Sequence, residues 1–196
     1  MDTGFELPAF VRDAERQTGP EGGERPLTAA ERGTAVHAVL ASLPAVSLTA
    51  EQVRAHCDGL VRAGALTERQ AEAVPAGSIS EIAQSALWAR MGASARCERE
   101  LPFSYLVPAA ALYGADAADE KVLLQGVIDC CFVTGDGWVL LDYKTDRLRA
   151  GVSLASMAAE HLPQLELYAE ALYRLTGLPV KERYVVLISA GRAVRV

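Results

Sequence analysis

The sequence predicts an α/β domain in which a mixed central sheet is flanked by helices. Two apolar runs rich in β-formers surround a turn at residues 135–137, which is typical of a β-hairpin. Helix-capping pairs recur between residues 28 and 81, and a further helical stretch from about 153 to 175 precedes an apolar strand. With 196 residues, of which 51% are hydrophobic, the chain can build one substantial core.

The first residues differ in character from the rest. Gly, Pro and charged residues crowd the end of residues 1–26, so we expect a flexible lead-in or linker there, followed by one domain over residues 27–196. The chain has no apolar run of about 18 residues, the length that suggests a membrane span. Its start lacks the basic region of a signal peptide. We therefore expect a cytoplasmic protein without a membrane partner.

The first helix is expected to begin at Thr28 and to end near Leu43, because Thr28 and Glu31 form a capping box and a proline follows Leu43. Gly33 and His37 are four residues apart and share one face, where the glycine removes bulk one turn from the imidazole. A histidine on an apolar helix is commonly a core residue. The spacing alone leaves that interpretation and a ligand role open.

Three more capped helices are expected before the sheet. Each begins with Thr or Ser followed three residues later by Gln or Glu, at Thr49, Thr67 and Ser78. They predict a helical insertion on the N-terminal side of the sheet, with helices near 50–63, 68–74 and 79–91.

Strands are expected from Arg96 onwards, where the apolar period changes. Residues 114–121 should form a surface loop, and the hairpin follows. The helical stretch after the hairpin should break or restart at Pro163. The last strands are expected at residues 184–188 and 193–196.

The hairpin gathers charged side chains. Asp142 and Lys144 project from one face of their strand while Tyr143 points the other way, and Asp129 comes close to Asp142 if the register permits. Two such carboxylates raise each other's pKa unless a cation lies between them, and Mg²⁺ or Mn²⁺ prefers oxygen ligands. A neighbouring lysine can orient or help deprotonate water and stabilise charge on a phosphate. This is the chemistry of metal-dependent phosphodiester hydrolysis.

A surface ion pair between Asp142 and Lys144 is the simpler explanation, because Asp and Lys two residues apart occur by chance in most chains. The position of the pair at the end of an apolar hairpin, with Gly126-Val-Ile-Asp129 before it, favours the catalytic interpretation.

Four blocks carry a resemblance to a known family. Together they resemble the RecB-like branch of the PD-(D/E)xK nuclease superfamily, and within it the C-terminal domains of the AddA family of helicase-nucleases. The resemblance covers the chain from about Leu27 to its end and implies the restriction-endonuclease-like fold. The blocks are Arg32-Gly-Thr-Ala-Val-His37, Gly126-Val-Ile-Asp129, Asp142-Tyr-Lys-Thr-Asp-Arg147 and Gln164-Leu-Glu-Leu-Tyr168.

The resemblance implies roles for these residues. His37, Asp129 and Asp142 would ligate one or two Mg²⁺ or Mn²⁺ ions, with the backbone carbonyl of Tyr143 as a further candidate ligand. Asp129, Asp142 and Lys144 would form the catalytic set, in which Lys144 positions or activates the water. An imidazole ligand favours Mn²⁺ somewhat, although Mg²⁺ fits as well.

Three other residues are implied to support the site. Gln164 and Tyr168 would reach the edge of the site and position the lysine or the DNA backbone. Glu100, in a segment that resembles the one before the nuclease hairpin of that family, would add an acidic group or contact Lys144. A glutamate on an edge strand, without a role at the site, explains Glu100 equally well.

The net charge and the cysteines bear on how DNA reaches the domain and on whether it holds an iron-sulfur cluster. A net charge of −6 is unusual for a protein that holds nucleic acid by itself, so we expect a larger assembly to deliver single-stranded DNA. By the resemblance, that assembly is an upstream helicase domain and an AddB-like subunit. The four cysteines lack the short spacings of a cluster site, so we expect reduced thiols and no iron-sulfur cluster; they are Cys57, Cys97, Cys130 and Cys131.

The expected function is that of a Mg/Mn-dependent deoxyribonuclease of the exonuclease type, acting on single strands made by a helicase in double-strand break repair. Two alternatives stay open. A non-catalytic RecB-like binding module would have no need of the set Asp129, Asp142 and Lys144. A free-standing RecB-like exonuclease would be expected to carry a more basic surface.

Overall fold

The computed structural model describes residues 25–108 and 121–196, and in these ranges five strands form one mixed sheet. The strand order follows the chain; β3 and β4 are parallel and the other neighbours are antiparallel. This confirms the predicted fold class and places the hairpin turn at Gly135 and Asp136. The strands are β1 (Cys97–Pro108), β2 (Lys121–Thr134), β3 (Gly137–Lys144), β4 (Val180–Leu187) and β5 (Arg192–Arg195).

Capping boxes begin three of the helices that precede β1, as predicted. In each, a threonine hydroxyl accepts a hydrogen bond from the N–H three residues later, and the side chain there accepts one from the threonine N–H. The caps Thr28, Thr49 and Thr67 begin α2 (Ala29–Ser42), α3 (Ala50–Arg62) and α4 (Glu68–Ala73).

The fourth predicted helix is wrong in its start and its length. Ser78 does not cap it, and two helices take its place: α5 (Ala76–Ala83) and α6 (Ala86–Gly92). The break occurs at Ser85, because its hydroxyl accepts a hydrogen bond from the Trp88 N–H at 3.2 Å and so begins a new helix.

The connection from β3 to β4 runs through α8 (Leu154–Ala159) and α9 (Leu162–Thr176). Parallel neighbours need such a crossover, because the chain must return to the end of the sheet from which β3 started. Pro163 lies in the first turn of α9, where its missing N–H costs no helical hydrogen bond. The predicted restart of the helical stretch at this proline is confirmed.

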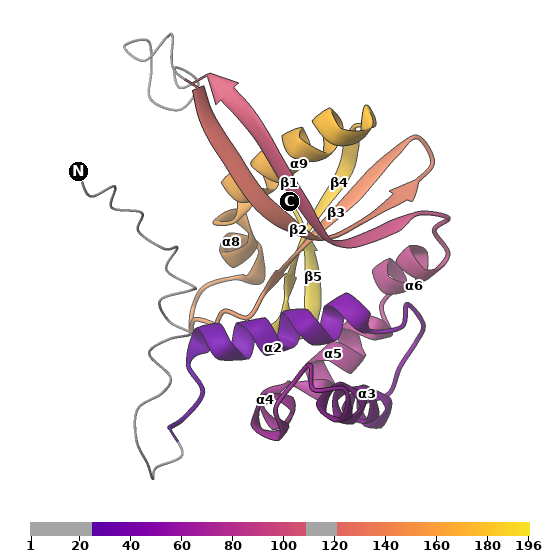
Figure 1. Ribbon diagram of the computed structural model, residues 1–196, viewed down its shortest axis with the longest axis vertical. Coiled ribbons are helices and arrows are strands. Elements are labelled where there is room, and N and C mark those ends of the chain that lie inside the picture. Colours follow the sequence, from indigo (N-terminus) through magenta and orange to yellow (C-terminus); the bar gives the residue numbers. More distant parts are fainter. Residues whose placement is uncertain (1–24, 109–120) are drawn as a thin grey trace, which may run out of the picture.

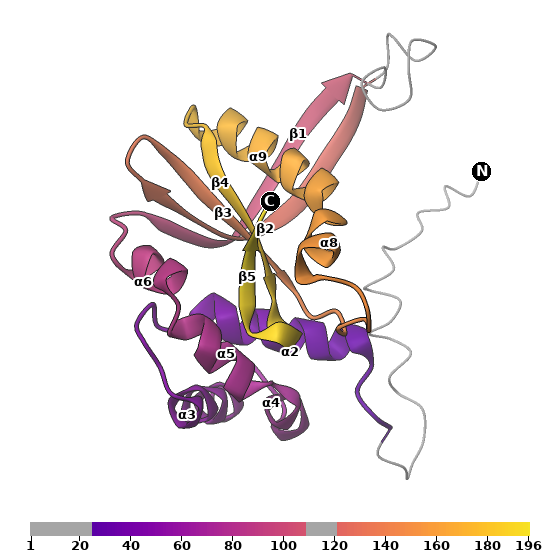
Figure 2. The same cartoon turned by 180° about the vertical axis from the view of Figure 1, so that it is seen from behind.

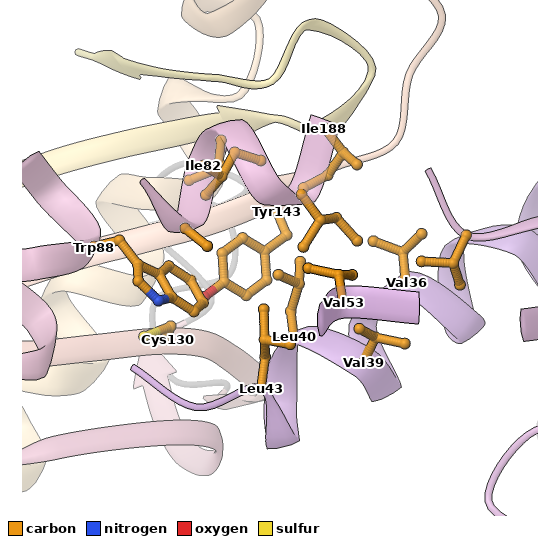
Figure 3. Packing of buried hydrophobic residues seen from close by; sticks show 14 of the residues in the cluster. Val36, Val39, Leu40, Leu43, Val53, Ile82, Trp88, Cys130, Tyr143 and Ile188 are labelled. Carbon is orange, nitrogen blue, oxygen red and sulfur yellow. The ribbon is translucent and has the colours of Figure 1, made fainter. Parts of the chain in front are cut away.

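Two hydrophobic layers enclose the sheet, one beneath α2 to α6 and one beneath α8 and α9 (Figures 1 and 2). Figure 3 shows the ring of Tyr143 in the first layer, close to side chains that include Leu40, Leu43 and Trp88. Along β3 every residue except Lys144 is buried. A charged side chain on this strand therefore needs a partner, since burying an uncompensated charge is costly.

The cysteines belong to these layers. Cys130 lies in the first layer and its neighbour Cys131 in the second, as the alternation of side chains along a strand requires. Cys57 is also buried, Cys97 is half-buried, and all four are free thiols.

Several remaining expectations concern the lead-in, a loop and the start of a strand. The predicted lead-in lies almost entirely outside the described residues, as does the predicted loop at 114–121 apart from Lys121, which begins β2. The boundary between linker and domain stays a prediction. β4 begins at Val180, earlier than predicted. Across the described part of the chain, no helix combines the length and the apolar character needed to cross a bilayer.

Candidate active site

The site begins where β2 and β3 stop pairing. The last paired residues of this ladder are Cys130 and Leu141, so the next step would place Asp129 opposite Asp142. Instead of a backbone pair, the Oδ2 atom of Asp129 accepts a hydrogen bond from the Tyr143 N–H at 2.7 Å. The side chain thus takes the place of a strand carbonyl, and the strands separate at the two acidic residues.

The pairing of β1 with β2 is also interrupted beside Asp129, and the side chains of β2 on either side of the interruption switch faces of the sheet. Arg99 pairs with Cys130 and Leu101 with Ile128, but the pair between them, Glu100 and Asp129, is missing from the ladder. Cys130 faces the layer beneath α2, whereas Ile128, two residues away, faces the layer beneath α9. Glu100 has a φ of 50°. Because of this local irregularity, the side chains of Glu100 and Asp129 do not follow the regular alternation between the two faces of the sheet.

The helix α2 brings His37 to these carboxylates. Its Nδ1 atom lies 3.3 Å from Asp129 Oδ1 and 3.8 Å from Glu100 Oε1. The imidazole also meets the Tyr143 ring edge to face, with centroids 6.0 Å apart. A Cβ atom at Gly33 would lie 3.5 Å from Thr145 Oγ1, an ordinary contact. Gly33 therefore faces the segment after β3, but the packing does not demand a glycine.

Arg99 fixes the end of that helix, and sequence reasoning missed it. Its Nη1 atom lies within hydrogen-bonding distance of the carbonyl oxygens of Leu40, Ala41 and Leu43, at 3.1, 3.3 and 2.5 Å. The last turn of α2 carries no basic residue of its own. A cation from β1 thus satisfies carbonyls that no helical N–H can reach. The only sequence signal is that Arg99 directly precedes Glu100.

His37, Glu100 and Asp129 form a group that can hold a metal ion. One candidate ligand atom from each lies within 4.8 Å of the others. An imidazole nitrogen beside carboxylate oxygens suits a divalent ion such as Mn²⁺ or Mg²⁺. Burial raises the pKa of Glu100, and the nearby Asp129 carboxylate raises that pKa further. The donor set therefore fits a divalent cation.

Asp142 lies outside that group and faces the lysine. Its Oδ2 atom is 2.9 Å from Lys144 Nζ, and the side chain of Asp142 is only 1% exposed. The Lys144 ammonium also donates to Gln164 Oε1 at 2.8 Å, and Gln164 Nε2 donates to the Tyr168 hydroxyl at 2.6 Å. A polar chain thus runs from the buried acid to α9, with the lysine held between a carboxylate and an amide.

The electrostatics couple the two halves of the site. Burial raises the pKa of Asp142 above its usual range, and the nearby Asp129 raises it further, while Lys144 opposes both effects. The pKa of His37 is raised chiefly by its hydrogen bond to Asp129, with smaller contributions from Glu100 and from the Tyr143 backbone. A buried acid with a raised pKa beside a lysine, next to a second acid paired with an imidazole, is typical of catalytic sites.

Sequence reasoning also missed the contact between the rings of Phe103 and Tyr168. Gly126 pairs with Phe103, and a Cβ atom at Gly126 would lie 2.7 Å from the Phe103 ring. The absence of a side chain lets that ring cover the strand. Tyr168 then packs edge to face on Phe103, with centroids 5.6 Å apart. The first residue of the Gly-Val-Ile-Asp block therefore positions α9 through an aromatic ring, and its pairing partner could not be known without the register.

The predicted residues therefore gather, but in two groups. His37, Asp129 and Glu100 form one, and Asp142 with Lys144, Gln164 and Tyr168 forms the other. The Tyr143 ring lies against the imidazole of His37, but within the residues that the structure describes no contact of the Tyr143 carbonyl with this group is established. The catalytic and ligand roles assigned to these residues remain predictions.

Fold and site together are those of a nuclease domain built on a mixed sheet. A profile of the PD-(D/E)XK nuclease superfamily matches residues 8–195, and the chain belongs to this family. Nucleases of this superfamily use divalent metal ions.

The chain also resembles one region of much longer proteins. It is 36% identical over 176 residues to AddA, a subunit of the ATP-dependent helicase/nuclease, from Desulforamulus reducens, covering 88% of this chain and 14% of that protein. The AddA proteins of Pelotomaculum thermopropionicum and Acetivibrio thermocellus are each 40% identical, over 175 and 171 residues. These matches cover 88% and 85% of this chain and 14% and 13% of the relatives. The resemblance seen in the sequence is confirmed, and the chain spans about a seventh of these relatives.

Proposed function

We propose that this domain hydrolyses phosphodiester bonds of DNA with the help of bound Mg²⁺ or Mn²⁺. The observation that carries the proposal is the meeting of a ligand group, His37, Glu100 and Asp129, with a lysine held by the buried Asp142. Together they offer a cation site and a proton-handling group at one point of the sheet.

The positions of the residues suggest separate roles in binding the cation and in handling the water and the phosphate. His37, Asp129 and Glu100 would hold the cation, with Asp142 and the Tyr143 carbonyl as further ligands once the ion draws them in. A bound cation would polarise the phosphate and neutralise charge that develops during hydrolysis. Lys144 would orient the attacking water and donate to a phosphate oxygen, since its ammonium is held by Asp142 and Gln164. Tyr168 positions Gln164 through a hydrogen bond and so acts on the lysine indirectly.

The assembly would be the one that the relatives' names describe. We infer that the domain works beside an ATP-dependent helicase in the same protein, together with an AddB-like subunit, on single strands produced during double-strand break repair. The net charge of −6 supports delivery of the strand by a partner rather than capture by this domain alone. An exonuclease mode fits a strand that is fed end first.

Cleavage of single-stranded DNA by the purified chain with Mn²⁺ tests the proposal. Asp142→Asn and Lys144→Ala should each lower the rate by about 100-fold or more, because the first removes the carboxylate that holds Lys144 and could join the ligands, and the second removes the ammonium proposed to contact the phosphate. The matched control is Asp136→Asn, since Asp136 is an exposed turn residue far along the hairpin from the site. Equal rates for wild type and both site variants would exclude catalysis here.

The two alternatives predict different results. A non-catalytic binding module would show no cleavage that depends on Asp142. A free-standing exonuclease would cleave at full rate without any helicase, whereas the proposed domain should act faster when the helicase and its AddB-like partner deliver the strand. Comparing the rates with and without these partners separates the two enzymes.

A further inference from the structure

A cavity with apolar and polar walls lies beside the site, at the amino-terminal half of α2. It has a volume of about 510 Å³, and its polar lining is formed by Arg32, Thr145, Arg147 and Ser189, with Asp146 as the one acid among its lining residues. Figures 1 and 2 show the segment after β3 passing this part of α2. Thr145 follows Lys144 directly, so the cavity adjoins the lysine end of the proposed active site.

The two arginines come from the blocks that build the site. Arg32 is the first residue of the block that ends in His37, and Arg147 is the last residue of the block that begins with Asp142. Each block therefore supplies a site residue at one end and a cavity arginine at the other. Segments more than a hundred positions apart in the sequence bring two guanidinium groups to one cavity.

These guanidinium groups have no acidic partner in the described parts of the chain. Within 25–108 and 121–196, no carboxylate oxygen lies within 4.0 Å of Arg32 or Arg147. Arg32 donates from Nη1 to the Leu27 carbonyl at 2.7 Å, which leaves its other N–H groups available. Asp146 lies 3.6 Å from His161 instead.

We propose that this cavity binds a phosphate of the substrate strand next to the phosphate that is cleaved. Guanidinium groups recognise phosphate oxygens through paired, charge-assisted hydrogen bonds, and the hydroxyls of Thr145 and Ser189 add donors. A strand whose phosphate lies at Lys144 carries its neighbouring phosphates along the segment that follows. The inference rests on the proposed function and gives an acidic domain a local anion site.

Binding of a fluorescent single-stranded oligonucleotide to the metal-free protein tests the proposal. Arg147→Gln should weaken binding by about tenfold at low salt, since a charge-assisted phosphate contact is lost. The slope of log affinity against log salt should fall by about 0.7, the share of one phosphate contact on a single strand. The matched control is Arg62→Gln, an exposed arginine of α3 that lines a different cavity. Arg147 is itself exposed, so its substitution should leave the fold intact.

A neutral linkage identifies the contact. A methylphosphonate placed at each position of the oligonucleotide in turn should weaken binding to wild type at one linkage, and Arg147→Gln should be insensitive there. Unchanged binding by Arg147→Gln, an equal loss in Arg62→Gln, or no binding by wild type would each overturn the proposal. Cleavage with Mn²⁺ is scored separately. If the protein cleaves DNA but neither binding nor cleavage depends on Arg147, only the phosphate-binding proposal is rejected. If binding depends on Arg147 but no cleavage occurs, only the proposed nuclease function is rejected.

Discussion

Glu100 combines two unfavourable features at one residue. Its φ of 50° lies in the left-handed region, which costs a residue with a side chain roughly 1–2 kcal/mol. Burial raises the pKa of its carboxylate, and the nearby Asp129 raises that pKa further. Such a residue weakens the metal-free protein, and the ligand role proposed for it would explain why it is tolerated. Strained residues of this kind cluster at functional sites.

Replacing Glu100 by Gln should therefore separate stability from metal binding. We expect Glu100→Gln to leave the thermal midpoint of the metal-free protein unchanged or higher, because the repulsion from Asp129 is removed. The upward shift of the midpoint on adding Mn²⁺ should become smaller, since one ligand is lost. Differential scanning fluorimetry with and without Mn²⁺ measures both, and Glu98→Gln on the same strand serves as control. A full Mn²⁺ shift in Glu100→Gln would show that Glu100 is no ligand.

If His37 is a metal ligand as proposed, the metal affinity will depend on pH. Its pKa is raised above 6.5 in the folded protein, chiefly by Asp129. The protonated imidazole therefore stabilises the metal-free fold fully below about pH 6.5, and this contribution is lost as the pH rises through the raised pKa. A metal ligand must be the neutral imidazole, so protons compete with the ion.

The apparent Mn²⁺ affinity should accordingly fall by about tenfold per pH unit below the raised pKa of His37. Calorimetric titration from about pH 5.5 to about pH 8.5, a range that brackets the usual titration of imidazole, measures this slope. His37→Gln should bind more weakly at high pH and lose the imidazole part of the slope. An identical pH profile in the variant would place the coupled proton elsewhere.

At the scale of elements, β1 holds α2 in place through Arg99. The guanidinium group meets three carbonyls of the last turn of α2 and lies over the Trp88 ring, 5.5 Å from its centroid. Because Glu100 follows Arg99 directly, the same strand fixes the helix that carries His37 and supplies the neighbouring carboxylate.

Arg99→Gln should lower the free energy of unfolding by about 2 kcal/mol, since buried carbonyls lose charge-assisted hydrogen bonds. It should also weaken Mn²⁺ binding, because α2 is less firmly placed. Arg99→Lys should restore part of both. Urea unfolding and calorimetric Mn²⁺ titration give the two values, with Arg54→Gln, an exposed arginine of α3, as control. Loss of stability with unchanged Mn²⁺ affinity would limit Arg99 to a structural role.

The contact between β2 and α9 depends on a missing side chain. An added Cβ at Gly126 would lie 2.7 Å from the Phe103 ring, so that ring would have to move. We expect Gly126→Ala to destabilise the protein by about 1–3 kcal/mol through overpacking and to lower the cleavage rate through Tyr168. Urea unfolding and a cleavage assay measure these effects. Gly77→Ala, which meets no atom within 4 Å, is the matched control.

At the scale of the whole molecule, burial is uneven. β3 is buried on both faces along nearly its whole length, whereas in β2 exposed residues alternate with half-buried ones up to Val127. Hydrogen exchange should therefore be slowest in β3 and in Val185 and Val186 of β4, and should proceed by local opening in the outer half of β2. Mass spectrometry of exchanged fragments measures this. Equal protection of Leu123 and Leu140 would contradict it.

The sequence predicts the architecture well where local chemistry decides it. The threonine capping boxes, the glycine turn and the crossover helices all follow from neighbouring residues. The start of β4 was placed too late because Lys181, Glu182 and Arg183 hide its first half. That half pairs with β3, and Glu182 is held by Arg90 of α6. Tertiary partners of this kind have no local signature.

The sequence predicted which residues come together at the site, but not how they are grouped there. Spacing placed Asp142 beside Lys144, and resemblance added His37, Gln164 and Tyr168. Neither could show that Glu100, rather than Asp142, completes the group with His37 and Asp129, because that arrangement depends on the irregularity at Glu100. Arg99 and Phe103 were missed because their contacts join elements far apart in the chain.

The hydrogen bond between Asp129 and the Tyr143 amide has a consequence for coordination. One oxygen of this carboxylate already accepts from the backbone, while Oδ1 lies on the side that faces His37 and is the oxygen placed to bind an ion beside the imidazole. If an ion binds beside His37 as proposed, the described side chains would approach it from one side only. Water and oxygens of a bound phosphate would then fill the remaining positions of a six-coordinate ion.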